Sequence, residues 1–305
     1  MCIEAGCNAV YGGLKRWNAR MNAQNFSVDE YKRLLAYSHH HGVKFYMTLN
    51  TLFKDDELKD IVKLFSDKDF IKPDAVIAAD LGLISVISKK FPDVNIHAST
   101  QFGATSIHDI NFLKNFNVKR VILARELTLH EIKEIRSRSD IQLEVFVYGS
   151  QCICFSGQCL WGGLTQERSG NRGRCSAPCR DFYECNGKIG HFLYHRDSNA
   201  SRIVKVLEKC GIDSIKIEGR FRDSEQIASV VAALRTAIDN PLSGTNEKSS
   251  AGGDTYIGYL GDSIPVNGAL SMLNPRTSLV QINDLECGSH DITAVIKSHN
   301  DITIN

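Results

Sequence analysis

Residues 143–179 read LEVFVYGSQCICFSGQCLWGGLTQERSGNRGRCSAPC, and the rest of the chain is organised around this stretch. Its first six residues are mostly apolar and are followed by Gly149, which predicts a buried strand that ends in a turn. Four cysteines, Cys152, Cys159, Cys175 and Cys179, then follow within 28 residues. The pattern therefore predicts a strand that leads into a long loop carrying four thiols.

Four converging thiolates can bind a metal centre, and three kinds of site stay open at this point. Iron–sulfur clusters take four cysteines from loops of variable spacing, which favours a 4Fe–4S cluster here. Structural zinc sites usually show two close cysteine pairs, whereas only Cys175 and Cys179 are close in this loop. Disulfides or unligated thiols are the third alternative. Cys154 adds a fifth thiol, which is either a ligand or a small buried side chain.

The composition of the 305 residues is that of an ordinary globular protein, with 43% apolar residues. The 36 basic and 35 acidic side chains nearly cancel, so the total charge does not indicate a nucleic-acid or membrane partner. We see no apolar run that would cross a membrane and no secretion signal at the N-terminus. Ten cysteines without such a signal predict a cytoplasmic protein that binds a metal rather than one with disulfides.

Short apolar runs alternate with amphipathic stretches along the first 240 residues. The expected strands are 8–13, 43–50, 74–79, 95–99, 119–124, 143–148 and 213–217, and the expected helices are 27–42, 55–66, 81–91, one from about 106, one after Thr128, 199–209 and 224–238. Strand–helix alternation predicts parallel pairing with the helices outside. We therefore expect an α/β fold of the (β/α)8 TIM-barrel type that lacks one strand, with an open doubly wound sheet as the alternative.

The composition and the hydrophobic pattern of the sequence change after Asn240. Residues 241–253 are rich in Gly and Ser and read as a linker. Residues 254–305 alternate polar and apolar side chains and predict a small β module, which we expect to be incomplete and for which the sequence suggests no function. The expected organisation is thus a barrel domain over 1–240, with the cysteine loop at 149–180, followed by a linker and this module.

Four motifs in the chain resemble the signature of peptidase family U32. They are FVYGSQC at 146–152, SGQC at 156–159, NRGRCSAPCR at 171–180 and IKIEGR at 215–220, within a similarity that runs from about residue 3 to residue 240. The family was named for collagenase-like proteases, and its fold implies a first strand before Met1. The cysteine spacing is most similar to the tRNA-hydroxylating branch, in which the four cysteines bind a 4Fe–4S cluster.

That resemblance implies a specific activity. It implies hydroxylation of a pyrimidine in tRNA, of the 5-hydroxyuridine type, with prephenate as a possible oxygen donor and structured RNA as the partner. Other relatives hydroxylate ribosomal RNA or ubiquinone, so the exact substrate stays open. The alternatives are a collagenase-like peptidase and a non-catalytic protein whose metal only holds the loop. Against a peptidase, the sequence has neither a Gly-x-Ser-x-Gly elbow nor a His-Glu-x-x-His helix.

Polar residues at the carboxyl ends of barrel strands are the candidates for a site, because chemistry collects there in TIM barrels. The catalytic candidates are His97, Gln101, Lys216 and Glu218, and the substrate-binding candidates are Tyr11, Asn50, Arg125, Arg172, Arg180 and Arg220. Strand alternation puts His97 and Gln101 on one side, and likewise Lys216 and Glu218, whose buried charges need partners or a ligand. The alternatives are a hydrogen-bonded core histidine at 97 and a rim ion pair between Arg125 and Glu126.

The charge of the cysteine segment favours RNA as the substrate. From Cys152 to Arg202 seven basic side chains stand against four acidic ones. Trp161, Phe182 and Tyr183 lie among these arginines, and an unpaired base can stack on such rings. The competing interpretation is that the arginines balance the negative charge of a thiolate-bound cluster.

Overall fold

In this computed structural model, residues 1–150, 152–155, 158–185, 188–191, 197–219, 222–239, 285–288 and 291–294 are described. Seven parallel strands form one sheet in the order β1-β2-β3-β4-β5-β6-β10. Their bounds are β1 Ala9–Gly12, β2 Lys44–Leu49, β3 Ala75–Ala78, β4 Asn95–Ala98, β5 Val118–Ile122, β6 Gln142–Ser150 and β10 Ser214–Ile217. All seven strands expected from the sequence are therefore confirmed.

The strand order decides between the two architectures that the sequence allowed. Each new strand is added on the same side of the previous one, whereas a doubly wound sheet reverses direction at a switch point. The sheet also curls, so that the Tyr11 hydroxyl of the edge strand β1 donates a hydrogen bond of 2.8 Å to the Ile217 carbonyl of the other edge strand, β10. The fold is thus α/β and TIM-barrel-like, with seven parallel strands in the described part of the chain.

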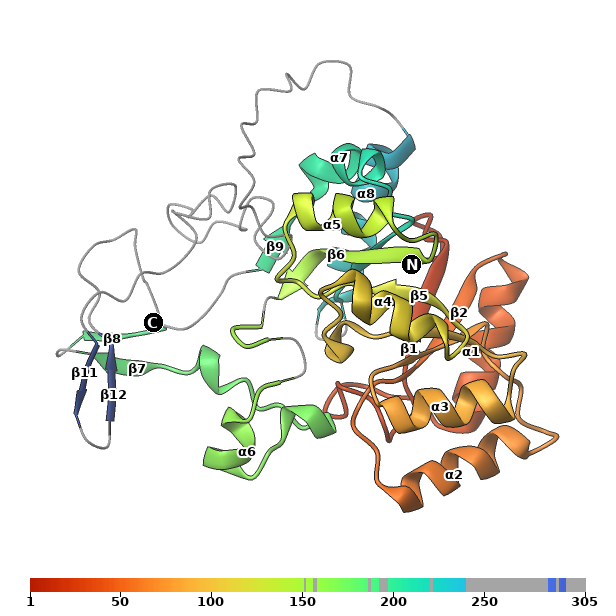
Figure 1. Cartoon of the computed structure of the whole chain (residues 1–305), viewed down its shortest axis with the longest axis horizontal. Coiled ribbons are helices and arrows are strands. Elements are labelled where there is room, and N and C mark those ends of the chain that lie inside the picture. The colour runs from red at the N-terminus through yellow and green to blue at the C-terminus, as the bar shows by residue number, and fades with distance from the viewer. Residues whose placement is uncertain are drawn as a thin grey trace.

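Helices follow the strands and cover the outside of the sheet (Figure 1). They are α1 Val28–His40, α2 Asp55–Ser66, α3 Leu81–Lys90, α4 Ile107–Lys114, α5 Leu129–Ser137, α7 Val204–Lys209 and α8 Ser224–Asp239. Their starts follow the expected capping chemistry. Ser27 accepts a hydrogen bond from the Glu30 amide and Glu30 reaches back to Ser27, which completes the capping box of α1.

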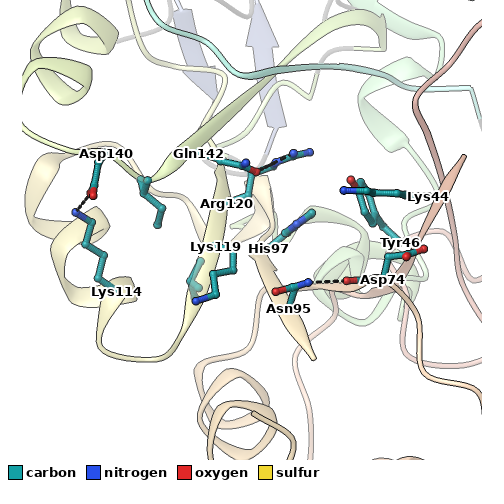
Figure 2. Close-up of a pocket in the computed structure, with 12 residues that line it drawn as sticks. Lys44, Tyr46, Asp74, Asn95, His97, Lys114, Lys119, Arg120, Asp140 and Gln142 are labelled. Atoms are coloured by element: carbon teal, nitrogen blue, oxygen red, sulfur yellow. Dashed lines mark hydrogen bonds and ion pairs between the residues drawn. The ribbon is translucent and has the colours of Figure 1, made fainter. Parts of the chain in front are cut away.

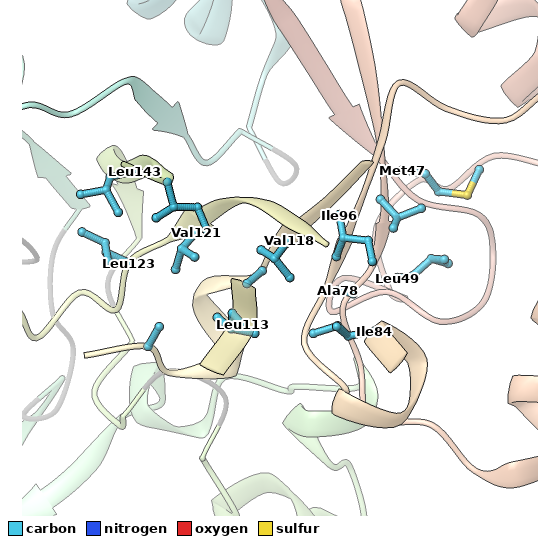
Figure 3. Packing of buried hydrophobic residues seen from close by; sticks show 14 of the residues in the cluster. Met47, Leu49, Ala78, Ile84, Ile96, Leu113, Val118, Val121, Leu123 and Leu143 are labelled. Atoms are coloured by element: carbon cyan, nitrogen blue, oxygen red, sulfur yellow. The ribbon is translucent and has the colours of Figure 1, made fainter. Parts of the chain in front are cut away.

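The main hydrophobic core lies between the outer face of the sheet and these helices. Figure 3 shows Ile96 of β4 and Val121 of β5 beside Ile84 of α3 and Leu113 of α4, all of them fully buried. Each such side chain contributes about 2 kcal/mol by leaving water. This shell holds the strands in place, so that their inward side chains and their ends are fixed in position.

The inside of the barrel combines an apolar layer with buried charges. Tyr46, Ile77 and Ile122 form a small apolar cluster there. Glu144 and Lys216 are buried beside this layer, and their side chains form an ion pair of 3.0 Å. The interior therefore contains buried charges as well as packed apolar side chains, which is unusual for a barrel core. Buried charges need partners or a ligand, so the two ends of the barrel are the places to look for a site.

Three segments differ from the expectation. The helix expected over 199–209 begins late, because strand β9 Asp197–Asn199 pairs antiparallel with β6 and a 3₁₀ turn at Ser201–Ile203 precedes α7. The cysteine segment contains a short helix, α6 Trp161–Gln166, and an antiparallel hairpin of β7 Tyr183–Cys185 and β8 Lys188–Gly190 that the sequence did not suggest. These pieces are only three to six residues long.

The expected linker at 241–253 lies outside the described residues, as does most of the expected β module. The described part of that module is one antiparallel pair, β11 Leu285–Gly288 and β12 Asp291–Ala294. Among the described residues, no helix combines the length and the apolar character needed to cross a bilayer.

Candidate functional site

A cavity of about 410 Å³ opens at the carboxyl ends of the parallel strands. It is lined by all four candidate cysteine ligands and by most of the other predicted site residues. These are Cys152, Cys159, Cys175 and Cys179 together with Tyr11, Asn50, Gln101, Arg125, Arg180, Lys216 and Glu218. The strand ends and the cysteine loop therefore form one site.

Glu218 follows β10 and occupies the centre of the charge network in this cavity. Arg20 donates to its Oε1, with an Nε contact of 3.1 Å, and the Arg125 guanidinium lies 3.6 Å from its Oε2. Burial raises the pKa of Glu218, but Arg20 and Arg125 outweigh burial and leave its pKa below the ordinary value. The carboxylate is therefore ionised, and its Oε2 has no hydrogen-bond partner among the described residues.

Close packing fixes Glu218 against the start of the cysteine loop. Its amide donates a hydrogen bond of 2.9 Å to the Tyr148 carbonyl at the end of β6. Gly149 has a φ of +124°, and a Cβ at this position would lie 2.5 Å from the Cβ of Glu218. Only glycine fits here, which explains the glycine turn that follows the strand.

Lys216 lies deeper in the barrel and connects the cavity to the buried interior. Its ammonium is 3.0 Å from Glu144 Oε1 and 4.2 Å from the centre of the Tyr11 ring. Burial raises the pKa of Glu144, yet Lys216 and Arg120 outweigh it and lower that pKa to about 2. Glu144 is therefore ionised and holds Lys216 in place by charge.

Arg125 and Asn50 complete the polar wall. The Arg125 guanidinium lies 4.5 Å from the centre of the Phe146 ring, and its Nε has no hydrogen-bond partner in the described part of the chain. Asn50 follows β2, and its side-chain oxygen accepts a hydrogen bond of 3.0 Å from the Ala19 amide. Asn50 thus fixes the loop that carries Arg20.

The four cysteines line the cavity as separate thiols. Burial and, after it, the neighbouring Cys152 raise the pKa of Cys179 to about 11. Within the described ranges, no three histidine, cysteine or carboxylate side chains are already arranged to hold a metal ion. The donor set nonetheless fits an iron–sulfur cluster, because four thiols line the same cavity. Cys154 is not among the residues that line the cavity.

The structure does not bring His97 into this cavity. The strand β4 ends at Ala98, and a 3₁₀ turn at Thr100–Phe102 follows, so the two-residue alternation from His97 to Gln101 is broken. Gln101 lines the cavity, whereas His97 lies inside the barrel and lines a second cavity at the other end. The expectation that His97 and Gln101 share the mouth was therefore wrong.

Arg172 is likewise not a cavity residue. It forms a bidentate ion pair with Glu57, with contacts of 2.7 and 2.8 Å, and also donates to the Leu52 carbonyl. Its role is to hold the cysteine loop against α2. Arg220, the remaining substrate-binding candidate, lies outside the described residues.

Sequence reasoning missed two arginines of the cavity, Arg20 and Arg222. Arg20 comes from the loop between β1 and α1, where no strand end or motif marks it. That loop is held against the cysteine segment, because the Met21 amide donates a hydrogen bond of 3.1 Å to the Gly173 carbonyl. Gly173 has a φ of +76°, and a Cβ there would lie 2.1 Å from the Asn18 carbonyl oxygen.

Removing the ion pair between Arg172 and Glu57 should loosen the cysteine loop. We expect Arg172→Ala to increase proteolytic cleavage within 158–180 and to lower the free energy of unfolding by about 1 kcal/mol, since a bidentate, partly buried pair is lost. Arg174→Ala is the matched control, because Arg174 is exposed and no ion pair of it is seen within the described ranges. Equal cleavage of both variants would show that the Glu57 contact does not fix the loop.

Comparisons with known proteins show which family the chain resembles. A family model described as peptidase family U32 matches residues 1–257. A 23S rRNA 5-hydroxycytidine synthase of Escherichia coli is 34% identical over 244 residues, which cover 78% of this chain and 37% of that protein. A tRNA hydroxylation protein of Bacillus subtilis is 31% identical over 255 residues, covering 78% of this chain and 60% of that protein. A collagenase of Porphyromonas gingivalis is 25% identical, covering 82% of this chain and 65% of its own.

Proposed function

Because this chain belongs to peptidase family U32, we propose that it is an iron–sulfur-dependent enzyme that hydroxylates a pyrimidine base in RNA, with tRNA as the first candidate. The chain spans only 37% and 60% of the two RNA-hydroxylating relatives, so their activities support this proposal and do not establish it. The observation that carries it is the single cavity in which four thiols meet Lys216, Glu218 and several arginines.

The four cysteines Cys152, Cys159, Cys175 and Cys179 would hold a 4Fe–4S cluster at the wall of the cavity. When bound, such a cluster supplies one-electron redox chemistry next to the substrate. The surrounding arginines, Arg20, Arg125, Arg180 and Arg222, offset the negative charge of thiolate ligation. They would also favour an anionic co-substrate, and prephenate, a dicarboxylate, is the proposed oxygen donor.

The polar groups of the cavity suit the edge of a pyrimidine. Glu218 Oε2 would accept a hydrogen bond from the N–H of a uracil ring, and Arg125 Nε would donate one to a ring carbonyl; both atoms have no hydrogen-bond partner among the described residues. Lys216, held by Glu144, supplies a fixed positive charge below the ring. These contacts would orient the base with one ring carbon towards the cysteine wall.

The proposal is tested by incubating the anaerobically reconstituted protein with unmodified tRNA and prephenate, and with an rRNA fragment as the second substrate. The nucleosides are then analysed by mass spectrometry. We expect a pyrimidine nucleoside heavier by one oxygen atom, and only when cluster and prephenate are both present. No such product with either RNA would reject the hydroxylase proposal.

A binding prediction follows from the surface of the cysteine segment. Phe182 is 68% exposed and its ring lies 3.9 Å from that of His191, while Arg168 and Arg174 are exposed nearby in the sequence. We expect Arg168→Glu with Arg174→Glu to weaken tRNA binding and to reduce the slope of log affinity against log salt by roughly 2, since two phosphate contacts are lost. Filter binding over a range of salt concentrations measures both effects.

The matched control is Lys89→Glu with Lys90→Glu at the end of α3, which changes the total charge equally. This control should keep the wild-type affinity to within about twofold, because only nearby charges contact the RNA. Equal weakening in both variants would mean that RNA responds to total charge, and the cysteine segment would then not be its binding surface.

The alternative is a collagenase-like peptidase, which the collagenase relative favours. Against it, no histidine lies among the described residues that line the cavity, so neither a serine nor a cysteine there has an imidazole base beside it. Robust gelatin hydrolysis by the cluster-loaded protein would nevertheless support this alternative.

A further inference from the structure

A second cavity lies at the opposite end of the barrel, where the parallel strands begin. Its volume is about 640 Å³, and its lining includes the first residues of four strands, among them Lys44 of β2 and Gln142 of β6. Figure 2 shows His97 between Lys44 and Tyr46 on one side and Lys119 and Arg120 on the other. The function proposed above makes no use of this end of the barrel.

The charges that line this cavity are predominantly positive. Four cationic side chains line it, Lys44, Lys114, Lys119 and Arg120, against the two carboxylates Asp74 and Asp140. Both carboxylates are already engaged, Asp74 by His39 at 2.8 Å and Asp140 by Lys114 at 2.6 Å. Lys44 and Lys119 form no ion pair within the described ranges, so their charges remain available to a ligand.

An irregularity of the sheet brings Lys119 to the cavity. The pairing of β4 with β5 runs from Ile96 opposite Val118 to His97 opposite Arg120, so Lys119 is an extra, unopposed residue. Bulges of this kind are rare between parallel strands and redirect a side chain, often beside a functional site. The bulge thus places an additional cation where regular pairing would have turned it away.

His97 is the second sign that a ligand belongs here. Its side chain is only 5% exposed, and its Nδ1 has no hydrogen-bond partner in the part of the chain that the structure describes. Burial, followed by the charge of Arg120, lowers the pKa of His97 to about 3, so the ring is neutral. A neutral imidazole can donate one hydrogen bond, and leaving a buried polar nitrogen unsatisfied costs about 1–3 kcal/mol.

We propose that this cavity is a second binding site, which takes a phosphate group between Lys44 and Lys119 with His97 Nδ1 as a neutral donor. The Arg120 guanidinium is already occupied by Gln142 at 2.8 and 3.0 Å and by Glu144 at 2.9 Å. The donors that remain are the compact ammonium groups of the two lysines, which bind phosphate as point charges. The phosphate belongs to a small phosphorylated metabolite or to the RNA backbone.

Inorganic phosphate is the probe for this site, because it carries the shared chemistry of both sources. Isothermal titration of the full chain should give saturable binding that Lys44→Met with Lys119→Met weakens at least about tenfold, as the loss of two charge contacts implies. The control pair Lys89→Met with Lys90→Met, on the exposed end of α3, should bind phosphate like the wild type. His97→Asn should weaken phosphate binding by a smaller factor, since it removes one neutral donor.

The source of the phosphate is decided by RNA binding of the same variants. If the lysine variant also loses tRNA affinity, the RNA backbone supplies the group; if tRNA affinity is unchanged, a small metabolite does. Absence of saturable phosphate binding in the wild type overturns the inference, and so does wild-type phosphate affinity in the lysine variant. Because the lysines and His97 lie outside the cysteine cavity, this test can fail while the hydroxylase proposal stands.

Discussion

Cys175→Ser is expected to remove the iron–sulfur cluster and to abolish RNA hydroxylation, whereas Cys154→Ser should preserve both. The two thiols belong to the same loop, but Cys175 lines the cavity with the other three candidate ligands and Cys154 does not. A 4Fe–4S cluster needs four thiolates, so the loss of one lining thiol should reduce the iron content from about four atoms per chain to a small fraction. The measurements are iron, sulfide and zinc analysis after anaerobic purification, together with the visible absorbance.

The pair of variants also separates a catalytic cluster from a structural one. The far-ultraviolet circular dichroism of Cys175→Ser should match that of the wild type, because the main core lies between the sheet and the helices, whereas the cysteines line a cavity at the ends of the strands. Unfolding of this variant would favour a metal that only holds the loop. Stoichiometric zinc without iron in the wild type, or cluster loss in Cys154→Ser alone, would contradict the assignment of the four ligands.

The part of the site that sequence could predict is the part that local rules determine. Lys216 and Glu218 were found because the sequence marks the end of a buried strand, and the structure places both side chains in the cavity. The cysteine loop was found in the same way, since a glycine turn after a buried strand fixes where the thiols begin. These features depend on residues within one strand and its turn.

The rest depended on contacts between distant segments. Arg172 was assigned to substrate, but Glu57 holds it from 115 residues away, and no periodicity shows such a pair. Arg20 reaches Glu218 from 198 residues away and was missed for the same reason. His97 was misplaced because the strand ended at Ala98, and element ends are where pattern reasoning is weakest.

The buried pair of Glu144 and Lys216 is expected to dominate the stability of the barrel interior. Glu144→Gln leaves Lys216 and Arg120 without a carboxylate in a place where Glu144 is only 4% exposed. We expect the free energy of unfolding at neutral pH to fall by about 3 kcal/mol, because an uncompensated buried charge remains. Chemical denaturation measures this loss, and Glu134→Gln on the surface of α5 is the control, with an expected change within about 0.5 kcal/mol.

The free energy of unfolding of the wild type should depend on pH in a way that also reports the charge of Glu144. Since the pKa of Glu144 is lowered from 4.5 to about 2 in the folded chain, its contribution is present above the ordinary pKa and disappears as the pH falls through this window. Glu144→Gln should lack that acid-sensitive part, so the stability difference between the two proteins should shrink between about pH 4.5 and pH 2. A difference that stays constant over this range would show that charge is not what Glu144 contributes.

A second substitution shows which cation makes the loss of Glu144 costly. Adding Lys216→Met to Glu144→Gln should recover at least about 1 kcal/mol, because the more deeply buried of the two cations is then removed while Arg120 keeps its contacts with Gln142. Lys216→Met made alone should not raise the stability above that of the wild type, since that change leaves Glu144 with Arg120 only. If the double variant and Lys216→Met alone are destabilised to the same extent, the ion pair is not the unit that stabilises the interior. Lys216 would then be held in the cavity by the rings of Tyr11 and Phe146 instead.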